Sequence, residues 1–336
     1  MRHYCTYFDA RYLPRALALY DSLVRSGGGI RLWALCLDAA SEDALRRLGL
    51  PGIEVISLRE FEAGDEALLA AKANRSTVEY YFTCSPSLPL FVLRRHPEVD
   101  LITYLDADLY FYADPEPIFD EIGDASIAIV PHRFAPRVAD KVRFGRFNVG
   151  WLTFRGDESG LECLNWWRER CLEWCYARQE GDRYADQKYL DRFPELFSNV
   201  RVIEHRGVNL GPWNLGNHGV SQEAGEIRVD GDPLICFHFA NFRRVASWLY
   251  NTDLASWHVR PSALVRRKVV GPYIDALRRQ DARLAALPAA VSAPPAPSRA
   301  PESFPTRMAR KLRAARRICS GLLLQDHLLL LRDRVL

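Results

Sequence analysis

Two aspartates after an apolar run have the types and spacing that point most directly to chemistry. Asp106 and Asp108 lie in the segment YLDADLYF, residues 104 to 111. Two carboxylates at the carboxyl end of a buried strand cost stability unless a cation or hydrogen bonds satisfy them. Hard divalent cations such as Mg²⁺ and Mn²⁺ take oxygen ligands, so the pair is a candidate metal site. The plainer interpretation is a solvated turn, because Asp is common in turns.

Several residues further along the chain are candidates only as members of motifs whose order resembles that of a known family, described below. They are Asn148 and Gly150 in FNVG, the neighbours Asp186 and Gln187, Asn209 and Trp213 in NLGPWN, and His238 in CFHF. Singly, each has a structural explanation. Glycine permits close backbone approach, and a histidine in an apolar run is more often a core residue than a ligand. Their conjunction in one order makes them candidates for function.

Strand and helix signals alternate around these residues and predict the fold that must position them. Strands are predicted at residues 3–8, 32–37, 53–58, 101–105, 126–130, 147–154 and 200–203, and helices at 13–26, 41–48, 66–91, 161–177 and 182–193. The helix at 66–91 is expected to be interrupted near Pro86 and Pro89. Strands separated by helices form βαβ units, and continuous apolar strands are covered on both faces. We therefore predict an α/β protein with a Rossmann-like, mainly parallel central sheet flanked by helices.

Composition limits the class of protein. The chain has 336 residues, 48% hydrophobic and 26% charged, which suits a soluble α/β domain with an appendage. A net charge of +3 does not favour nucleic-acid binding through the whole surface. The N-terminus has no signal-peptide pattern, no apolar window reaches membrane-spanning length, and the eight cysteines form no CxxC pair. We therefore expect a cytoplasmic protein with reduced thiols.

In this order the motifs resemble those of the A-type glycosyltransferases, and within them glycosyltransferase family 8, which includes glycogenin and bacterial lipopolysaccharide glycosyltransferases. The resemblance covers roughly residues 1 to 245. It implies the nucleotide-diphospho-sugar transferase fold. It also implies that Asp106, Asp108 and His238 together bind the metal ion.

The other motifs match segments that bind the sugar donor in that family. The resemblance implies donor contacts by Thr6, Tyr7 and Asp9 in the opening strand, Asn148 and Gly150 beside the donor sugar, and Asn209 and Trp213 in a late Trp-Asn element. Asp186 and Gln187 occur where the family has an Asp-Gln pair near the reacting anomeric carbon. These residues are therefore the expected donor site.

Basic residues depart from the family pattern. After its histidine the family continues with a glycine and a Lys-Pro-Trp that contacts the diphosphate, whereas this chain reads ANFRR, residues 240 to 244. We expect Arg243 or Arg244 to replace that lysine, because a guanidinium binds phosphate oxygens through parallel N–H groups. From its order along the chain, Arg75 is expected to add a further basic contact to the donor.

The resemblance implies transfer of a sugar from a nucleoside-diphosphate sugar, with a UDP-sugar favoured, to an acceptor hydroxyl. The expected acceptor is a glycan or glycolipid of the bacterial cell surface, and Mn²⁺ or Mg²⁺ would neutralise the departing diphosphate. An inverting reaction needs a carboxylate base, for which Asp186 is the candidate. In the family, Asp186 and Gln187 would instead hold the donor sugar, so we expect retention.

The composition changes near residue 287. Residues 1–286 are expected to form the catalytic domain, and residues 287–305 a Pro/Ala-rich linker. Residues 306–336 predict a helical tail, in which a basic amphipathic helix precedes a more apolar one. Such a tail fits either the inner face of the membrane, as a peripheral contact, or a partner or second copy of the chain. Its basic cluster has no interleaved aromatics, which argues against nucleic acid.

Two other functions are alternatives. A sugar nucleotidyltransferase also uses carboxylate-bound metal on an α/β sheet, but it is expected to have a glycine-rich loop after its first strand. Residues 8–11, FDAR, occupy that place here. A non-catalytic relative that binds nucleotide-sugars or carbohydrates would have an incomplete metal motif, whereas Asp106, Asp108 and His238 are all present.

Overall fold

The computed structural model describes residues 1–288, 327–331 and 334–335. The chain divides into two compact units, Met1–His238 and Phe239–Leu336. Nearly all of the expected linker and most of the basic tail, residues 289–326, lie outside the described residues. The predicted domain boundaries therefore stay a prediction.

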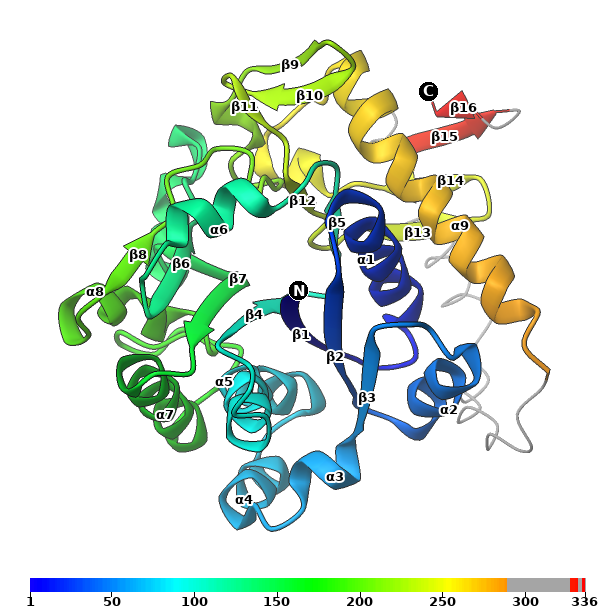
Figure 1. Cartoon of the computed structure of the whole chain (residues 1–336). Helices are drawn as coiled ribbons and strands as arrows, with labels where there is room; N and C mark the ends of the chain where they lie inside the picture. The colour runs from blue at the N-terminus through cyan, green and yellow to red at the C-terminus, as the bar shows by residue number, and fades with distance from the viewer. Residues whose placement is uncertain (289–326, 332–333, 336) are drawn as a thin grey trace, which may run out of the picture. The chain divides into compact units, whose positions relative to one another are not determined.

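The first unit is built on a seven-stranded sheet of order β3-β2-β1-β4-β7-β6-β8, shown in Figure 1. Its strands are β1 (Arg2–Phe8), β2 (Ile30–Cys36), β3 (Ile53–Ser57), β4 (Leu101–Leu105), β6 (Ile127–Pro131), β7 (Phe147–Arg155) and β8 (Val200–Val202). β7 runs antiparallel to both of its neighbours, and the other strands share one direction. The prediction of a mainly parallel sheet is confirmed.

Helices cover both faces of this sheet (Figure 1). One face carries α3 (Leu58–Glu62), α4 (Glu66–Asn74), α5 (Thr77–Arg95) and α7 (Glu158–Glu173), the other carries α1 (Leu13–Ser26) and α6 (Glu116–Ile122), and α2 (Ala39–Leu48) packs beside β2 and β3. Successive strand residues point to opposite faces, so Tyr4 and Cys5 join different buried clusters. Burial on both faces explains why the strands are apolar at nearly every position.

Smaller elements complete the first unit. β5 (Leu109–Phe111) pairs with β12 (Cys236–His238), and β9 (Val220–Glu223), β10 (Glu226–Val229) and β11 (Asp232–Pro233) form a separate three-stranded sheet. The 3-10 helices η1 (Pro136–Phe144) and η3 (Leu215–Asn217) lie in the connections.

The helix predicted over residues 66–91 is two helices, and the expected break at the prolines is wrong. Pro86 and Pro89 are buried inside the continuous helix α5. The chain breaks instead before α5, because Ser76 and Glu79 form a capping box. The Glu79 carboxylate accepts from the Ser76 N–H at 2.9 Å, and the Ser76 hydroxyl accepts from the Glu79 N–H at 3.4 Å. Packing in the core holds α5 together despite the missing proline N–H groups.

The helix predicted over residues 182–193 is also wrong in its first half. Helical structure begins only with the 3-10 helix η2 (Lys188–Arg192), which runs into α8 (Phe193–Leu196). Ala185 has a φ of 46°, in the left-handed region, which a continuous right-handed helix excludes. The Trp167 indole Nε1 donates to the Asp186 carbonyl at 2.9 Å and fixes this turn. Asp186 therefore projects from a turn and not from a helix face.

In its described residues, the second unit has a sheet of order β13-β14-β15-β16 and a helical segment. Its elements are β13 (Arg243–Ala246), β14 (Leu249–Asn251), the 3-10 helix η4 (Leu254–Trp257), the π-helical turn η5 (Val265–Val270), α9 (Gly271–Ala285), β15 (His327–Leu331) and β16 (Arg334–Val335). β15 pairs antiparallel with β14 and β16 with β15. The helix expected over residues 328–331 is therefore wrong, because these residues belong to β15, which pairs with β14. Residues 306–326, where the basic helix is predicted, lie outside the described residues.

Within the described ranges, no helix has the length and apolar character needed to cross a membrane. The seven cysteines that the structure describes are all buried and form no disulfide.

Candidate active site

Asp106, Asp108 and His238 meet at the carboxyl end of β4. The two aspartates occupy the turn between β4 and β5, and antiparallel pairing of β5 with β12 sets His238 opposite Leu109. His238 Nε2 lies 3.0 Å from Asp108 Oδ1 and 3.5 Å from Asp106 Oδ2. One ligand atom from each residue falls within 4.8 Å of the other two. The sequence predicted these three residues, and the fold brings them together.

The donor set of this cluster fits a divalent cation. Two carboxylate oxygens and one imidazole nitrogen converge, and the described residues contain no second group of this kind. The side chains of Asp106, Asp108 and His238 are 31%, 11% and 5% exposed, so the cluster is open to solvent mainly at Asp106. The three residues therefore form a candidate metal site with one accessible side.

The charges in the cluster also favour a cation. Burial, together with the negative charge of Asp108, raises the pKa of Asp106. Burial acts on Asp108 in the same direction, but the neighbouring His238 outweighs it and lowers the pKa of Asp108. Burial would lower the pKa of His238, but the two carboxylates outweigh it and raise that pKa. Two acids beside one base leave excess negative charge for a cation to balance.

Tyr104 orients Asp106, a role that was not predicted from the sequence. The Tyr104 hydroxyl donates to Asp106 Oδ1 at 2.8 Å, which turns Oδ2 towards His238. The Tyr7 ring lies 5.7 Å from the Tyr104 ring, and its hydroxyl is 3.1 Å from Ser85 Oγ. Tyr7, a predicted donor contact, therefore lies beside the cluster and is linked to it through Tyr104.

Asn209 and Asn148 connect the cluster to the predicted donor-sugar residues. Asn209 Oδ1 lies 3.0 Å from His238 Nδ1, and Asn209 Nδ2 donates to Asn148 Oδ1 at 2.9 Å. Asn148 Nδ2 lies 3.0 Å from His132 Nε2 and 3.4 Å from Gln187 Oε1. The sequence missed His132, whose only signal is its position directly after a buried strand. The structure brings together five polar side chains from separate segments.

Gly150 is required by this close packing. A Cβ atom at Gly150 would lie 2.6 Å from Asn148 Oδ1 and 2.6 Å from the His238 ring, which is closer than real Cβ contacts. Since both neighbours are buried, neither can move freely aside. The close approach to the Gly150 backbone is thus made by Asn148 and His238, its neighbours within the protein.

Asp186 lies buried near the same cluster. Burial raises the pKa of Asp186 to about 7, a hydrogen bond with Ser85 works against this, and the charge of Asp106 adds to it. Its neighbour Gln187 donates from Nε2 to the Phe144 carbonyl at 3.1 Å, which fixes the direction of that amide. The Asp-Gln pair is therefore held rigidly beside Asn148.

Trp213 packs against two histidines of the site. Its ring packs edge-on against His238 and His132, at centroid distances of 5.1 and 5.5 Å. Asn214 holds the turn that carries it, because Nδ2 donates to the His132 carbonyl at 2.9 Å and Oδ1 accepts from the Gly211 N–H at 2.8 Å. Trp213 thus supports the two histidines.

The turn after β1 is closed by its own side chain. Asp9 Oδ1 accepts from the N–H groups of Arg11 and Tyr12, at 3.0 and 3.1 Å. These are amides that a glycine-rich phosphate loop would offer to its ligand. The geometry therefore gives no support to a nucleotidyltransferase loop at this place.

Three residues that the sequence predicts to contact the donor are Thr6, Arg75 and Arg243. Within the first unit, no contact links them to the Asp-Asp-His cluster. Thr6 is fully buried in β1. The Arg75 guanidinium donates to the Tyr176 hydroxyl at 2.8 Å and to the Leu172 carbonyl at 3.0 Å, so it caps the end of α7. Arg243 lies exposed on β13 in the second unit. Their donor contacts stay predictions.

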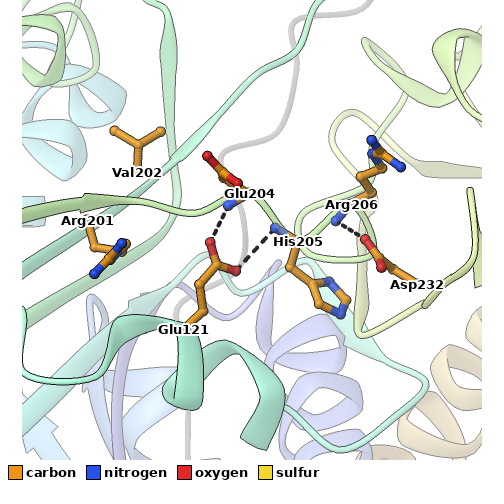
Figure 2. Close-up of a pocket in the computed structure, with 7 residues that line it drawn as sticks. All are labelled: Glu121, Arg201, Val202, Glu204, His205, Arg206 and Asp232. Atoms are coloured by element: carbon orange, nitrogen blue, oxygen red, sulfur yellow. Dashed lines mark hydrogen bonds between the residues drawn. The ribbon is translucent and has the colours of Figure 1, made fainter.

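A cavity of about 550 Å³ lies elsewhere in the first unit and contains none of these residues (Figure 2). Its lining residues are Glu121, Arg201, Val202, Glu204, His205, Arg206 and Asp232. As Figure 2 shows, the Glu121 carboxylate accepts from the N–H groups of Glu204 and His205, and Asp232 accepts from the N–H of Arg206 at 2.9 Å. These carboxylates stabilise the loop that precedes Asn209 by accepting hydrogen bonds from its backbone.

No protein-family model matches the chain. It is 38% identical over 251 residues to YfnF of Bacillus subtilis (strain 168), which covers 72% of this chain and 82% of YfnF. It is 31% identical over 281 residues to YfnD of the same organism, which covers 82% of this chain and 89% of YfnD. Both relatives are uncharacterized proteins.

The galactosyltransferase LgtC, solved as a crystal structure in complex with donor and acceptor sugar analogs, shares the fold. It aligns with a TM-score of 0.52 at 15% identity and covers 85% of this chain and 97% of its own. The fold is that of the A-type glycosyltransferases, as the sequence predicted. By sequence, the chain belongs to the family that contains YfnF and YfnD.

Gly150→Ala should destabilise the protein by about 1–3 kcal/mol, because the added methyl group overpacks a buried site. Urea unfolding measures this free energy. Gly28→Ala is the matched control, since a Cβ there meets nothing within 4 Å, and its stability should stay close to that of the wild type. Equal stability of the two variants would contradict the packing argument.

Asp186→Asn should stabilise the protein above pH 7. The pKa of Asp186 in the folded protein, about 7, lies above its ordinary value of 3.8. Between these values the folded state keeps a proton that the unfolded chain has lost, so the stability contributed by Asp186 falls as pH rises through this window. Asparagine cannot ionise, so we expect a gain on the order of a few kcal/mol at alkaline pH that disappears near pH 4.

Urea unfolding across this pH range, without added divalent cations, measures the difference. Asp182→Asn removes a mostly exposed carboxylate from the same loop and serves as the control. A pH-independent difference between Asp186→Asn and the wild type would show that burial does not hold the proton.

Proposed function

We propose that this protein is a metal-dependent glycosyltransferase that moves a sugar from a nucleoside-diphosphate sugar to an acceptor hydroxyl. The observation that carries the proposal is the convergence of Asp106, Asp108 and His238 at the carboxyl end of β4. Ligands of open α/β sheets bind beyond the carboxyl ends of the strands. A carboxylate-rich cation site at this edge suits a donor that carries a diphosphate.

Mn²⁺ is the better candidate for the cation than Mg²⁺. Mg²⁺ favours oxygen ligands in octahedral geometry, whereas Mn²⁺ accepts a mixture of carboxylate and imidazole ligands more readily. When bound, the cation supplies a Lewis acid that offsets the negative charge of the departing diphosphate. His238, whose Nε2 faces both carboxylates, is the residue that supports this choice.

Asp186, Gln187 and Asn148 are proposed to hold the donor sugar. Gln187 is fixed by the Phe144 carbonyl and lies in hydrogen-bond contact with Asn148, so its position is set before the donor arrives. Rigid placement of such groups lowers the entropy cost of reaching the transition state. Because Asp186 is buried among these groups, we assign it to the donor sugar, and the proposed reaction retains configuration.

The proposed donor is a UDP-sugar and the proposed acceptor a glycan or glycolipid of the bacterial cell surface. The motif order along the chain supports the donor, and the donor and acceptor sugar analogs bound to LgtC support transfer between a donor sugar and an acceptor sugar. Arg243 or Arg244 is proposed to contact the diphosphate, and the basic tail to contact the inner face of the membrane or a partner chain. The arginine assignment rests on the family resemblance, and the tail assignment rests on the basic and leucine-rich composition of residues 306–336.

A panel of nucleoside-diphosphate sugars should contain one donor that raises the melting temperature only when Mn²⁺ is present. A ligand that binds the folded state raises the melting temperature by mass action, so the assay needs no acceptor. In Asp108→Asn the shift should be lost, because one metal ligand is lost. Asp120→Asn, which removes an exposed carboxylate on α6, should keep the full shift. A full shift without Mn²⁺, or in Asp108→Asn, would overturn the metal-dependent donor site.

The donor identified in this way can also be used to determine whether transfer retains or inverts the configuration of the sugar. Slow hydrolysis of the donor by the enzyme should release the sugar first with the donor's own anomeric configuration, which proton NMR reads before mutarotation. An inverted first product would mean that Asp186 serves as a base for the attacking group.

A further inference from the structure

A row of buried amide groups joins the backbone N–H of Gly150 to the imidazole of His238. The Gly150 N–H donates to Asn148 Oδ1 at 2.9 Å, the same oxygen accepts from Asn209 Nδ2 at 2.9 Å, and Asn209 Oδ1 lies 3.0 Å from His238 Nδ1. All three side chains in the row are buried. Buried polar groups need partners, so the direction of each hydrogen bond constrains the next.

The first group in the row sets the direction of the Asn148 amide. A backbone N–H can only donate, so the Asn148 atom that faces Gly150 is the oxygen. Asn148 Nδ2 then faces two acceptors, Gln187 Oε1 and His132 Nε2. Burial lowers the pKa of His132 to about 3, so its imidazole is neutral and Nε2 can accept. The oxygen of the Asn148 amide therefore faces donors, and its nitrogen faces acceptors, so one orientation of the amide satisfies both.

The orientation of the Asn148 amide determines the orientation of the Asn209 amide. Because Asn148 presents an oxygen, Asn209 must donate to it from Nδ2 and turn its own oxygen towards His238. His238 then has to donate from Nδ1, so Nε2, which faces Asp106 and Asp108, is the nitrogen left to bind a cation in place of a proton. Asn209 also has a φ of 53°, a left-handed conformation that asparagine tolerates better than most residues.

We propose that Gly150, Asn148 and Asn209 form a relay that fixes His238 as the tautomer protonated on Nδ1. Asn148, Asn209 and His132 are thus positioning residues of the metal site. The inference rests on the proposed function, because it takes the Asp-Asp-His cluster as a cation site. A metal binds the bare nitrogen of an imidazole, and a hydrogen bond at the other nitrogen orients the ring and makes it a better ligand.

Mn²⁺ binding tests the relay without any turnover. Electron paramagnetic resonance of free Mn²⁺ gives the affinity, measured with and without UDP. Asn209→Leu should weaken binding by about 10–100-fold, the usual loss when the partner of a metal-bound histidine is removed. Asn148→Leu should weaken it by a similar factor although Asn148 does not contact His238, because the Asn209 amide is then free to turn.

Asn165→Leu, on α7, is the matched control and should bind Mn²⁺ as the wild type does. If the wild type binds Mn²⁺ in an Asp108-dependent manner and Asn209→Leu or Asn148→Leu binds as tightly, the relay is wrong and the metal site stands. If the wild type binds no Mn²⁺ under either condition, the proposed function fails and the relay with it.

A second measurement is made on the wild-type chain, and a variant serves only to assign a signal. In protein labelled with nitrogen-15 at histidine and loaded with Cd²⁺, a diamagnetic substitute for Mn²⁺, NMR distinguishes the protonated nitrogen of each imidazole. His238 and His132 should both carry their proton on Nδ1, and His132→Gln assigns the second signal. A bare Nδ1 on His238, or a proton on Nε2 of His132, would overturn the relay.

Discussion

The antiparallel pairing of β5 with β12 joins the end of the first unit to a turn that lies far earlier in the chain. This pairing sets His238 opposite Leu109, directly beside the turn that carries Asp106 and Asp108. Without it, the carboxylates of Asp106 and Asp108 would lack the imidazole that now lies 3.5 and 3.0 Å from them, and like charges placed together cost stability. The neighbouring backbone hydrogen bond from His238 N–H to the Leu210 carbonyl, at 2.7 Å, brings in the segment that carries Asn209. One strand thus assembles the cluster and its support together.

The close packing around His238 leaves little freedom to its neighbours. Gly150 is accommodated because it lacks a side chain, and the space is taken by Asn148 and the imidazole ring. Ala185 and Asn209 both hold left-handed backbone conformations next to the site, each of which costs roughly 1 kcal/mol or more for a residue with a Cβ atom. Surrounding contacts offset this cost, including the Trp167 indole on the Asp186 carbonyl. The site is therefore rigid because its backbone, its amides and its rings constrain one another.

Support also reaches the site from outside it. Glu121 on α6 and Asp232 on β11 hold the loop before Asn209 through backbone N–H groups. Tyr104, at the other side, orients Asp106 from within β4. Positioning of this kind gives a structural role to polar and aromatic residues that are not themselves members of the Asp-Asp-His cluster. It also explains why a functional site can extend over helices, strand ends and loops that are distant in sequence.

The sequence by itself determined the α/β architecture, most strand positions, and the candidate role of Asp106 and Asp108, because apolar periodicity and a polar strand end are local signals. The order of the motifs added His238, Asn148, Asn209 and the Asp186-Gln187 pair. Tertiary structure alone decided that α5 continues through Pro86 and Pro89, that Asp186 projects from a turn, and that residues 328–331 pair as part of a strand. It alone brought in His132 and Tyr104 and used Arg75 as a cap for α7. These outcomes depend on which distant segments pack or pair, and the energy of such contacts outweighs local propensity without leaving a local pattern in the sequence.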